Sequence, residues 1–447
     1  MATEPLSPLD LAFWRIESAA HPMHLGALAV FEAASPDAAA RAAELLAARC
    51  AALPGLRRRI HDVLFPFGAA VWSPDADFDP ARHVFLTGAG AADPAPAAAD
   101  PHAAAGPLMA RPLDRARPPW EAHVLAGPGP DSFAVLFKFH HALADGLGAL
   151  ALAAGLFDDA LPPREPARRL PEQGDSPGSA LRRLPGVLAS RVQDLGQALE
   201  IGAAVARAGL PLGVPAALAA GPAAGTRSVT GLALDLDEVN LIRKAVGGTV
   251  NDVLIALVAG ALRRWLAGRG DPEPLGAGPR ALIPVSRRRP GAAPGAGNRL
   301  SGYLLRLPLA ESDPLRRLAA VRTGMDRNKE AGPARGAGAV ALLADHVHPL
   351  GHRLGGPLVA QAARLLYDIL VTSVPLPGLT FTLGGSRVRE VYPLAPLAPG
   401  QSLAVAVSTY KGTVHYGLVA DAASVPDLAA LAGALRAELD ALVHEVT

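Results

Sequence analysis

The sequence predicts an α+β protein of two comparable halves, on three grounds. First, its 447 residues exceed the roughly 250–300 at which a single hydrophobic core usually stops growing. Second, strand and helix patterns are mixed both early and late in the chain. Third, residues 161–187 are dense in Pro, Arg and Gly, as is typical of a crossover between domains. We expect an N-terminal domain over 1–160, a crossover over 161–226 and a C-terminal domain over 227–447.

In the first half, residues 23–32 have the pattern of a strand, and residues 35–53 that of a helix with Ser35 as N-cap. Residues 132–140, SFAVLFKFH, predict a strand that ends at two adjacent histidines. Its two faces are expected to carry Phe133, Val135, Phe137 and Phe139 on one side, and Ala134, Leu136, Lys138 and His140 on the other.

In the second half, a strand that begins near Ser228 is followed by a short helix, a glycine turn and a long helix that starts near Thr249. Residues 377–421 contain several short strands separated by turns. Residues 425–446 predict a closing amphipathic helix.

Charge and composition narrow the class of protein. The 42 basic and 41 acidic residues nearly cancel, so no global charge favours nucleic acid as a partner. The basic runs LRRR and SRRR fit either a solvated face or a phosphate contact. Cys50 is the only cysteine, which excludes internal disulfides and cysteine-based zinc sites. Apolar runs are too short for a membrane span and the N-terminus lacks a secretory signal, so we expect a cytoplasmic protein.

The segment HHALADG, residues 140–146, carries the candidate chemistry. An imidazole titrates near neutral pH, so His140 or His141 could take a proton from a hydroxyl and return it to a leaving thiolate. Gly146 suits a sharp turn from strand to helix. Asp145 is expected to organise that turn by holding backbone groups or an arginine. A metal site on His141 and Asp145 is the alternative, although no third ligand is indicated.

The same segment resembles the HHxxxDG motif of the CoA-dependent acyltransferase superfamily, which includes chloramphenicol acetyltransferase, carnitine acyltransferases and nonribosomal condensation domains. Further segments, spread over the whole chain, make it similar to the bacterial wax ester synthase/diacylglycerol acyltransferase family. They are LSPLDLAFWRIESAAHPMHLGALAVFE, RPLDRARPPWEAHVLAG, TVNDVLIALVAGALRRWL, IPVSRRRPGAAPGAGNRLSGYLLRLPL and VSTYKGTVHYGLVAD.

The resemblance implies two chloramphenicol-acetyltransferase-like domains with an active-site tunnel between them. It implies that His141 is the general base and that His140 supports it. The acyl group would pass directly from acyl-CoA, a substrate and not a cofactor, to a long-chain alcohol or diacylglycerol. No acyl-enzyme and no metal are implied, and contact with a membrane or lipid droplet is left open.

Further site residues are implied by matching positions. Asn251 and Asp252 match an Asn-Asp pair that opens a helix facing the cleft, although the same residues would also serve as a helix cap. Trp120 matches a position that either anchors the core or contacts substrate. Asn298 matches a family position, with a turn as its other interpretation.

Arg288 matches the last residue of a Pro-Val-Ser-x-Arg run. Either Arg288 or Arg287 is a candidate partner for Asp145.

The chain departs from the family pattern in one place. TSVPLP has Ser373 and Leu376 where the family has Asn and Gly, so this loop is expected to run differently and the acceptor is put in doubt. The cluster of His346, His348 and His352 invites a metal interpretation, but intervening Pro and Gly break any single-face spacing.

Two other functions remain open. The fold and base could serve secondary metabolism, with a carrier-protein thioester as donor or a polyketide-like hydroxyl as acceptor. A lipid-binding protein without catalysis is the third interpretation, although the intact histidine segment argues against it.

Overall fold

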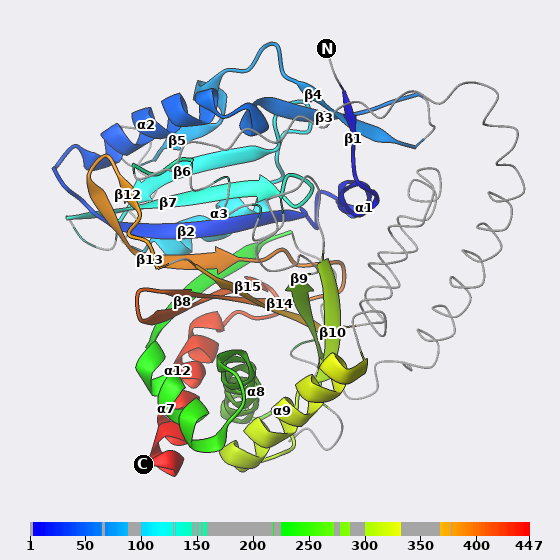
Figure 1. The fold of residues 1–447 in the computed structure, drawn as a ribbon, viewed down its shortest axis with the longest axis vertical. Helices are drawn as coiled ribbons and strands as arrows, with labels where there is room; N and C mark the ends of the chain where they lie inside the picture. Colours follow the sequence, from blue (N-terminus) through cyan, green and yellow to red (C-terminus); the bar gives the residue numbers. More distant parts are fainter. Residues whose placement is uncertain are drawn as a thin grey trace, which may run out of the picture.

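The computed structural model describes residues 3–64, 68–87, 100–127, 129, 131–144, 148, 152, 155–158, 218, 225–271, 278–286, 300–331, 367–376 and 378–447. These residues form two six-stranded sheets, a smaller three-stranded sheet and helices that cover them (Figure 1). The predicted α+β class with two sheet-based halves is confirmed.

The first six-stranded sheet has the strand order β12-β13-β2-β7-β6-β5. Its strands are β2 (His24–Glu32), β5 (Val84–Leu86), β6 (Trp120–Ala126), β7 (Ser132–His140), β12 (Thr382–Leu383) and β13 (Ser386–Leu394). The predicted strands at 23–32 and 132–140 are therefore confirmed as β2 and β7. They pair antiparallel, and their register places His24 opposite His140.

The second six-stranded sheet has the order β10-β9-β11-β14-β15-β8. Its strands are β8 (Arg227–Asp235), β9 (Arg280–Ser286), β10 (Leu300–Arg306), β11 (Ile369–Pro375), β14 (Leu403–Tyr410) and β15 (Thr413–Asp421). β11 runs parallel to both of its neighbours, and the other pairs are antiparallel.

The chain crosses between the two sheets. β12 and β13 follow β11 in sequence, yet β13 pairs with β2 in the first sheet, where Tyr392 lies opposite Leu28. The chain then returns to the second sheet as β14. The predicted C-terminal domain over 227–447 thus contributes two strands, β12 and β13, to the first sheet. The boundaries of the two domains remain a prediction from the sequence.

The third sheet has the order β1-β4-β3. Its strands are β1 (Glu4–Pro5), β3 (Arg58–Asp62) and β4 (Ala70–Pro74), and the 3-10 turns are η1 (Pro54–Arg57) and η2 (Pro80–Arg82). The described helices are α1 (Pro8–Ile16), α2 (Ala38–Ala52), α3 (Pro101–Ala110), α7 (Leu236–Val246), α8 (Val250–Gly268), α9 (Pro314–Ala331) and α12 (Leu428–Val446).

The two faces of β7 contact different layers, as the alternating pattern predicts. The odd-numbered side chains of β7, from Phe133 to Phe139, pack into one cluster with α2. Leu136 and Ala134 belong to another cluster that also contains Ala404 and Ala406 of β14. The even-numbered face of β7 therefore points at the second sheet, and the ring of His140 belongs to this face.

Helix α2 begins later than its sequence predicts. The hydroxyl of Ser35 bonds the carboxylate of Asp37, and the Ala38 amide donates to the Ser35 carbonyl at 3.0 Å, so a turn precedes the helix. Asp37, not Ser35, is the N-cap residue. The turn from Ser35 to Ala38 explains the difference, because it sets Ser35 outside the helix.

No single helix in the described ranges is long and apolar enough to cross a membrane. Helices α7 and α8 together are long and apolar enough for a membrane span, but the chain bends by 102° between them. Most of α8 is buried in the core beneath the second sheet, which accounts for its apolar composition.

Candidate active site

The histidine pair lies where β7 ends. The amide of His140 donates to the Pro119 carbonyl at 2.9 Å, and the amide of His141 donates to the Met23 carbonyl at 2.8 Å. The Leu143 amide donates back to the His140 carbonyl at 2.9 Å and closes a turn. The backbone of both histidines is therefore fixed by neighbouring segments of the first sheet.

The ring of His141 stacks on Phe13 of α1, with the two ring centroids 3.9 Å apart and the planes 13° from parallel. Helix α1 is capped by Ser7, whose hydroxyl accepts from the Asp10 amide at its first turn. The imidazole of His141 stays partly exposed. A group that must exchange a proton with a substrate needs both a fixed plane and this access.

The ring of His140 is buried and oriented from several sides. Its Nδ1 accepts a hydrogen bond from the Ala142 amide at 3.0 Å, so in the neutral ring the proton is on Nε2. Nε2 lies 3.7 Å from a carboxylate oxygen of Glu17. The edge of Trp14 covers the ring, with centroids 5.2 Å apart. His140 therefore has no accessible basic nitrogen.

Electrostatics leads to the same distinction between the two histidines. Burial, and then the neighbouring imidazoles of His141 and His24, lower the pKa of His140 well below its ordinary value. Burial also lowers the pKa of His24 to about 3. His24 Nε2 lies 2.7 Å from the Met109 carbonyl oxygen. Both buried histidines are neutral at pH 7, so neither competes with His141 for the proton.

Glu17 is a site residue that the sequence analysis does not single out. Its side chain is only 7% exposed, and it accepts a hydrogen bond from the Met23 amide at 3.1 Å. Burial raises the pKa of Glu17 against the opposing effects of the Met23 amide and of Arg115. Because the Met23 carbonyl holds the amide of His141, Glu17 contacts both the loop that positions His141 and the ring of His140.

A buried cation lies beneath the histidines on the same face of β7. Lys138 is fully buried, and its Nζ donates to the carbonyls of Leu108 and Arg111 at 3.0 and 2.9 Å and pairs with Glu121 at 3.1 Å. Burial opposes ionisation of Glu121, but the hydrogen bond from His123 and the charge of Lys138 prevail and lower its pKa. This network fixes the end of β7.

Trp120 is a core residue on the other face of the first sheet. Its indole Nε1 donates to the Leu56 carbonyl at 2.7 Å, and its ring stacks between His83 and Phe137 at 4.6 and 5.7 Å. Only 1% of Trp120 is exposed. Of the two interpretations of this residue, the structure supports the core anchor.

Asn251 and Asp252 open helix α8. Thr249 is the N-cap and forms a capping box with Asp252, as the predicted helix start requires. Asp252 Oδ2 accepts the bonds of the capping box, whereas Oδ1 is buried without a hydrogen-bond partner in the described part of the chain. Helix α8 packs on the face of the second sheet that points away from the first, where the Tyr416 hydroxyl donates to the Leu254 carbonyl. A role in substrate binding stays a prediction.

The departure at TSVPLP is accommodated without strain at Leu376. Lys411 is the only described residue other than glycine with a positive φ, so Leu376 has an ordinary backbone conformation. Its side chain packs against the core of the first sheet. Ser373 lies within β11, opposite Val407 of β14.

Several predicted residues lie outside the described part of the chain. They are Asp145, Gly146, Arg287, Arg288, Asn298, His346, His348 and His352. Within the described ranges, no three His, Cys, Asp or Glu side chains are placed to hold a metal ion.

Comparison with known proteins agrees with this arrangement. The family model "Wax ester synthase/diacylglycerol acyltransferase catalytic domain" matches residues 6–254, and the model "WS/DGAT C-terminal domain" matches residues 296–443. A probable diacylglycerol O-acyltransferase of Mycobacterium tuberculosis is 31% identical over 98% of this chain and 95% of its own length. A second from the same organism is 31% identical over 99% of both chains.

Solved structures share the fold. The wax ester synthase/diacylglycerol acyltransferase of Marinobacter aquaeolei VT8 superposes with a TM-score of 0.70 at 23% identity and covers 99% of both chains. A trichothecene 15-O-acetyltransferase of Fusarium sporotrichioides gives a TM-score of 0.64 at 13% identity, covering 98% of this chain and 95% of its own. The family match over more than half the sequence and the relatives at 31% identity show that the chain belongs to the wax ester synthase/diacylglycerol acyltransferase family and is an acyltransferase.

Proposed function

We propose that the enzyme transfers a fatty acyl group from acyl-CoA to the hydroxyl of a long-chain alcohol or of diacylglycerol, with His141 as general base. The observation that carries the proposal is the contrast between the two histidines. His140 is buried with Nδ1 already engaged, whereas His141 is partly exposed and held flat against Phe13. The names of the relatives supply the substrate classes.

In the proposed reaction, His141 removes the proton of the acceptor hydroxyl as its oxygen attacks the thioester carbonyl. The carbon–oxygen bond forms, the carbon–sulfur bond breaks, and the imidazolium of His141 returns the proton to the departing CoA thiolate. The products are one ester and one free CoA. His141 ends the cycle neutral, so no further reactant is needed.

Direct transfer requires no nucleophile on the protein, and the only cysteine is poorly suited to be one. Cys50 is fully buried in α2 within the core of the first sheet. Burial raises the pKa of its thiol to about 12, so the thiolate is scarce at neutral pH.

The tunnel between the two halves remains part of the proposal. Apolar walls would suit two long hydrocarbon chains, because burial of each methylene contributes about 0.8 kcal/mol. The proposed acceptors gather in membranes or lipid droplets, so contact with such a surface belongs to the proposal as well.

The experiment offers the purified protein palmitoyl-CoA with hexadecanol, with diacylglycerol, and with neither. We expect ester and an equal amount of free CoA with at least one lipid acceptor. A parallel reaction replaces the CoA thioester by a carrier-protein thioester. Transfer from the carrier protein alone, with none from CoA, would favour the alternative in secondary metabolism.

Glu17 provides a second test of the same site. Glu17→Ala should lower kcat by about 10-fold, because the Met23 loop that holds the His141 amide loses its side-chain acceptor. Glu17→Gln keeps an oxygen that can accept from the Met23 amide and should retain most of kcat. Steady-state kinetics of both variants, with exposed Glu32→Ala as control, would show this order. Equal losses in the two Glu17 variants would contradict the positioning role.

A further inference from the structure

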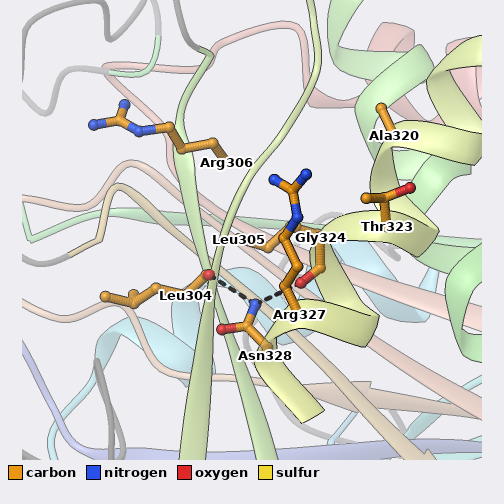
Figure 2. Close-up of a pocket in the computed structure, with 8 residues that line it drawn as sticks. All are labelled: Leu304, Leu305, Arg306, Ala320, Thr323, Gly324, Arg327 and Asn328. Atoms are coloured by element: carbon orange, nitrogen blue, oxygen red, sulfur yellow. Dashed lines mark hydrogen bonds between the residues drawn. The ribbon is translucent and has the colours of Figure 1, made fainter. Parts of the chain in front are cut away.

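A pocket of about 560 Å³ lies between β10 and α9, away from the proposed proton-transfer site. Figure 2 shows its lining residues, which come from both elements. They are Leu304, Leu305, Arg306, Ala320, Thr323, Gly324, Arg327 and Asn328.

The floor of the pocket is firmly built. The side-chain amide of Asn328 donates to the Leu304 carbonyl across the gap and to the Gly324 carbonyl on its own helix, each at 3.0 Å (Figure 2). Gly324 permits this close approach, because a Cβ there would lie 2.3 Å from Leu305 Cδ1. These two hydrogen bonds therefore hold the helix and the strand together at this point.

The pocket carries two positive charges, one on each of the two elements that line it. Arg306 on β10 and Arg327 on α9 are both exposed. Neither forms an ion pair with a described residue. On the same helix, Arg322 and Lys329 both pair with Asp326. Arg316, outside the pocket, shares with the pocket arginines the lack of an ion pair to a described residue. In Figure 2 the guanidinium group of Arg327 extends upward from its helix, and that of Arg306 extends to the left, away from the helix.

Such a pocket suits a phosphorylated nucleotide. A guanidinium group presents a planar fork of donors that matches phosphate oxygens, and its flat face also stacks on aromatic rings. The apolar side chains of Leu304 and Ala320 offer a surface for a purine ring. Arg306 and Arg327, which pair with no carboxylate among the described residues, supply the charge that a phosphate requires.

We infer that the pocket binds the nucleotide end of the acyl-CoA donor, with Arg306 and Arg327 on its phosphates. This inference rests on the proposed function, because acyl-CoA carries a phosphorylated ADP at the end opposite its thioester. In Figure 1, β10 and α1, which carries Phe13, lie on the same side of the view. The pantetheine arm would join the pocket to His141.

The test compares Arg306→Gln, Arg327→Gln and the double variant with Arg316→Gln. Arg316 is an exposed arginine on the same helix outside the pocket, so the control carries the same change of charge. Calorimetry measures binding of CoA and of dephospho-CoA, and kinetics measure KM for acyl-CoA and for the acyl thioester of N-acetylcysteamine, which lacks the nucleotide. Melting temperatures confirm that the variants are folded.

We expect each pocket variant to weaken CoA binding and to raise KM for acyl-CoA about 10-fold, with no change for the N-acetylcysteamine thioester. CoA binding equal to that of Arg316→Gln would overturn the inference. So would a loss of binding to phosphatidylglycerol vesicles with unchanged KM for acyl-CoA, because the phosphate would then belong to a lipid headgroup. If CoA binds and the variants lose it while no acyl transfer occurs, the pocket assignment stands and the proposed function fails.

Discussion

His141→Ala should lower turnover by about 10²–10⁴-fold, the usual contribution of a general base. Its KM for acyl-CoA should hardly change, because the imidazole acts on the acceptor hydroxyl in the transition state and contributes little to thioester binding. The fold should survive, since the His141 ring is partly exposed and its backbone amide bond to the Met23 carbonyl does not need the side chain.

The matched control is His140→Asn. The asparagine side chain can offer an acceptor to the Ala142 amide, as Nδ1 of His140 does at 3.0 Å. We expect this variant to lose much less turnover than His141→Ala, with melting temperature followed in both. Equal losses at the two positions, or full activity in His141→Ala, would contradict the assignment of the base.

Lys138→Ala should reduce the free energy of unfolding by about 3–5 kcal/mol, because it breaks a buried ion pair and removes the donor of two backbone hydrogen bonds at once. Glu121 would remain behind with only His123 and Arg111 as partners, and two backbone carbonyls would lose their donor. Urea unfolding of the variant measures the loss.

The control for this prediction is Lys244→Ala. Lys244 is exposed near the end of α7, so its loss should change the free energy of unfolding by no more than about 0.5 kcal/mol. A Lys138→Ala protein as stable as the Lys244→Ala control would show that the buried network contributes little.

Local patterns predicted the elements that carry the histidines. The alternation along 132–140 separates the face of Phe133 from the face of His140, and the structure confirms both. The start of α8 was predictable because a capping box is a signal within four residues. In each case the determining contacts lie close together in sequence.

Features that depend on distant parts of the chain could not be predicted in this way. Nothing in the pattern of 386–394 distinguishes a strand of the second sheet from one that pairs with β2. Glu17 and His140 meet only because α1 lies across the end of β7. The pocket lined by Asn328 exists because α9 folds back on β10, which no local signal specifies.

The central claim is direct acyl transfer with His141 as base, and parallel measurement of ester and free CoA tests it most directly. The wild-type protein and His141→Ala would each receive acyl-CoA and a lipid acceptor, and intact-protein mass spectrometry would follow any covalent adduct. The account predicts equal amounts of ester and CoA from the wild type, no acylated protein, and nearly none of either product from His141→Ala. An acylated protein, CoA released without ester, or undiminished ester from His141→Ala would contradict it.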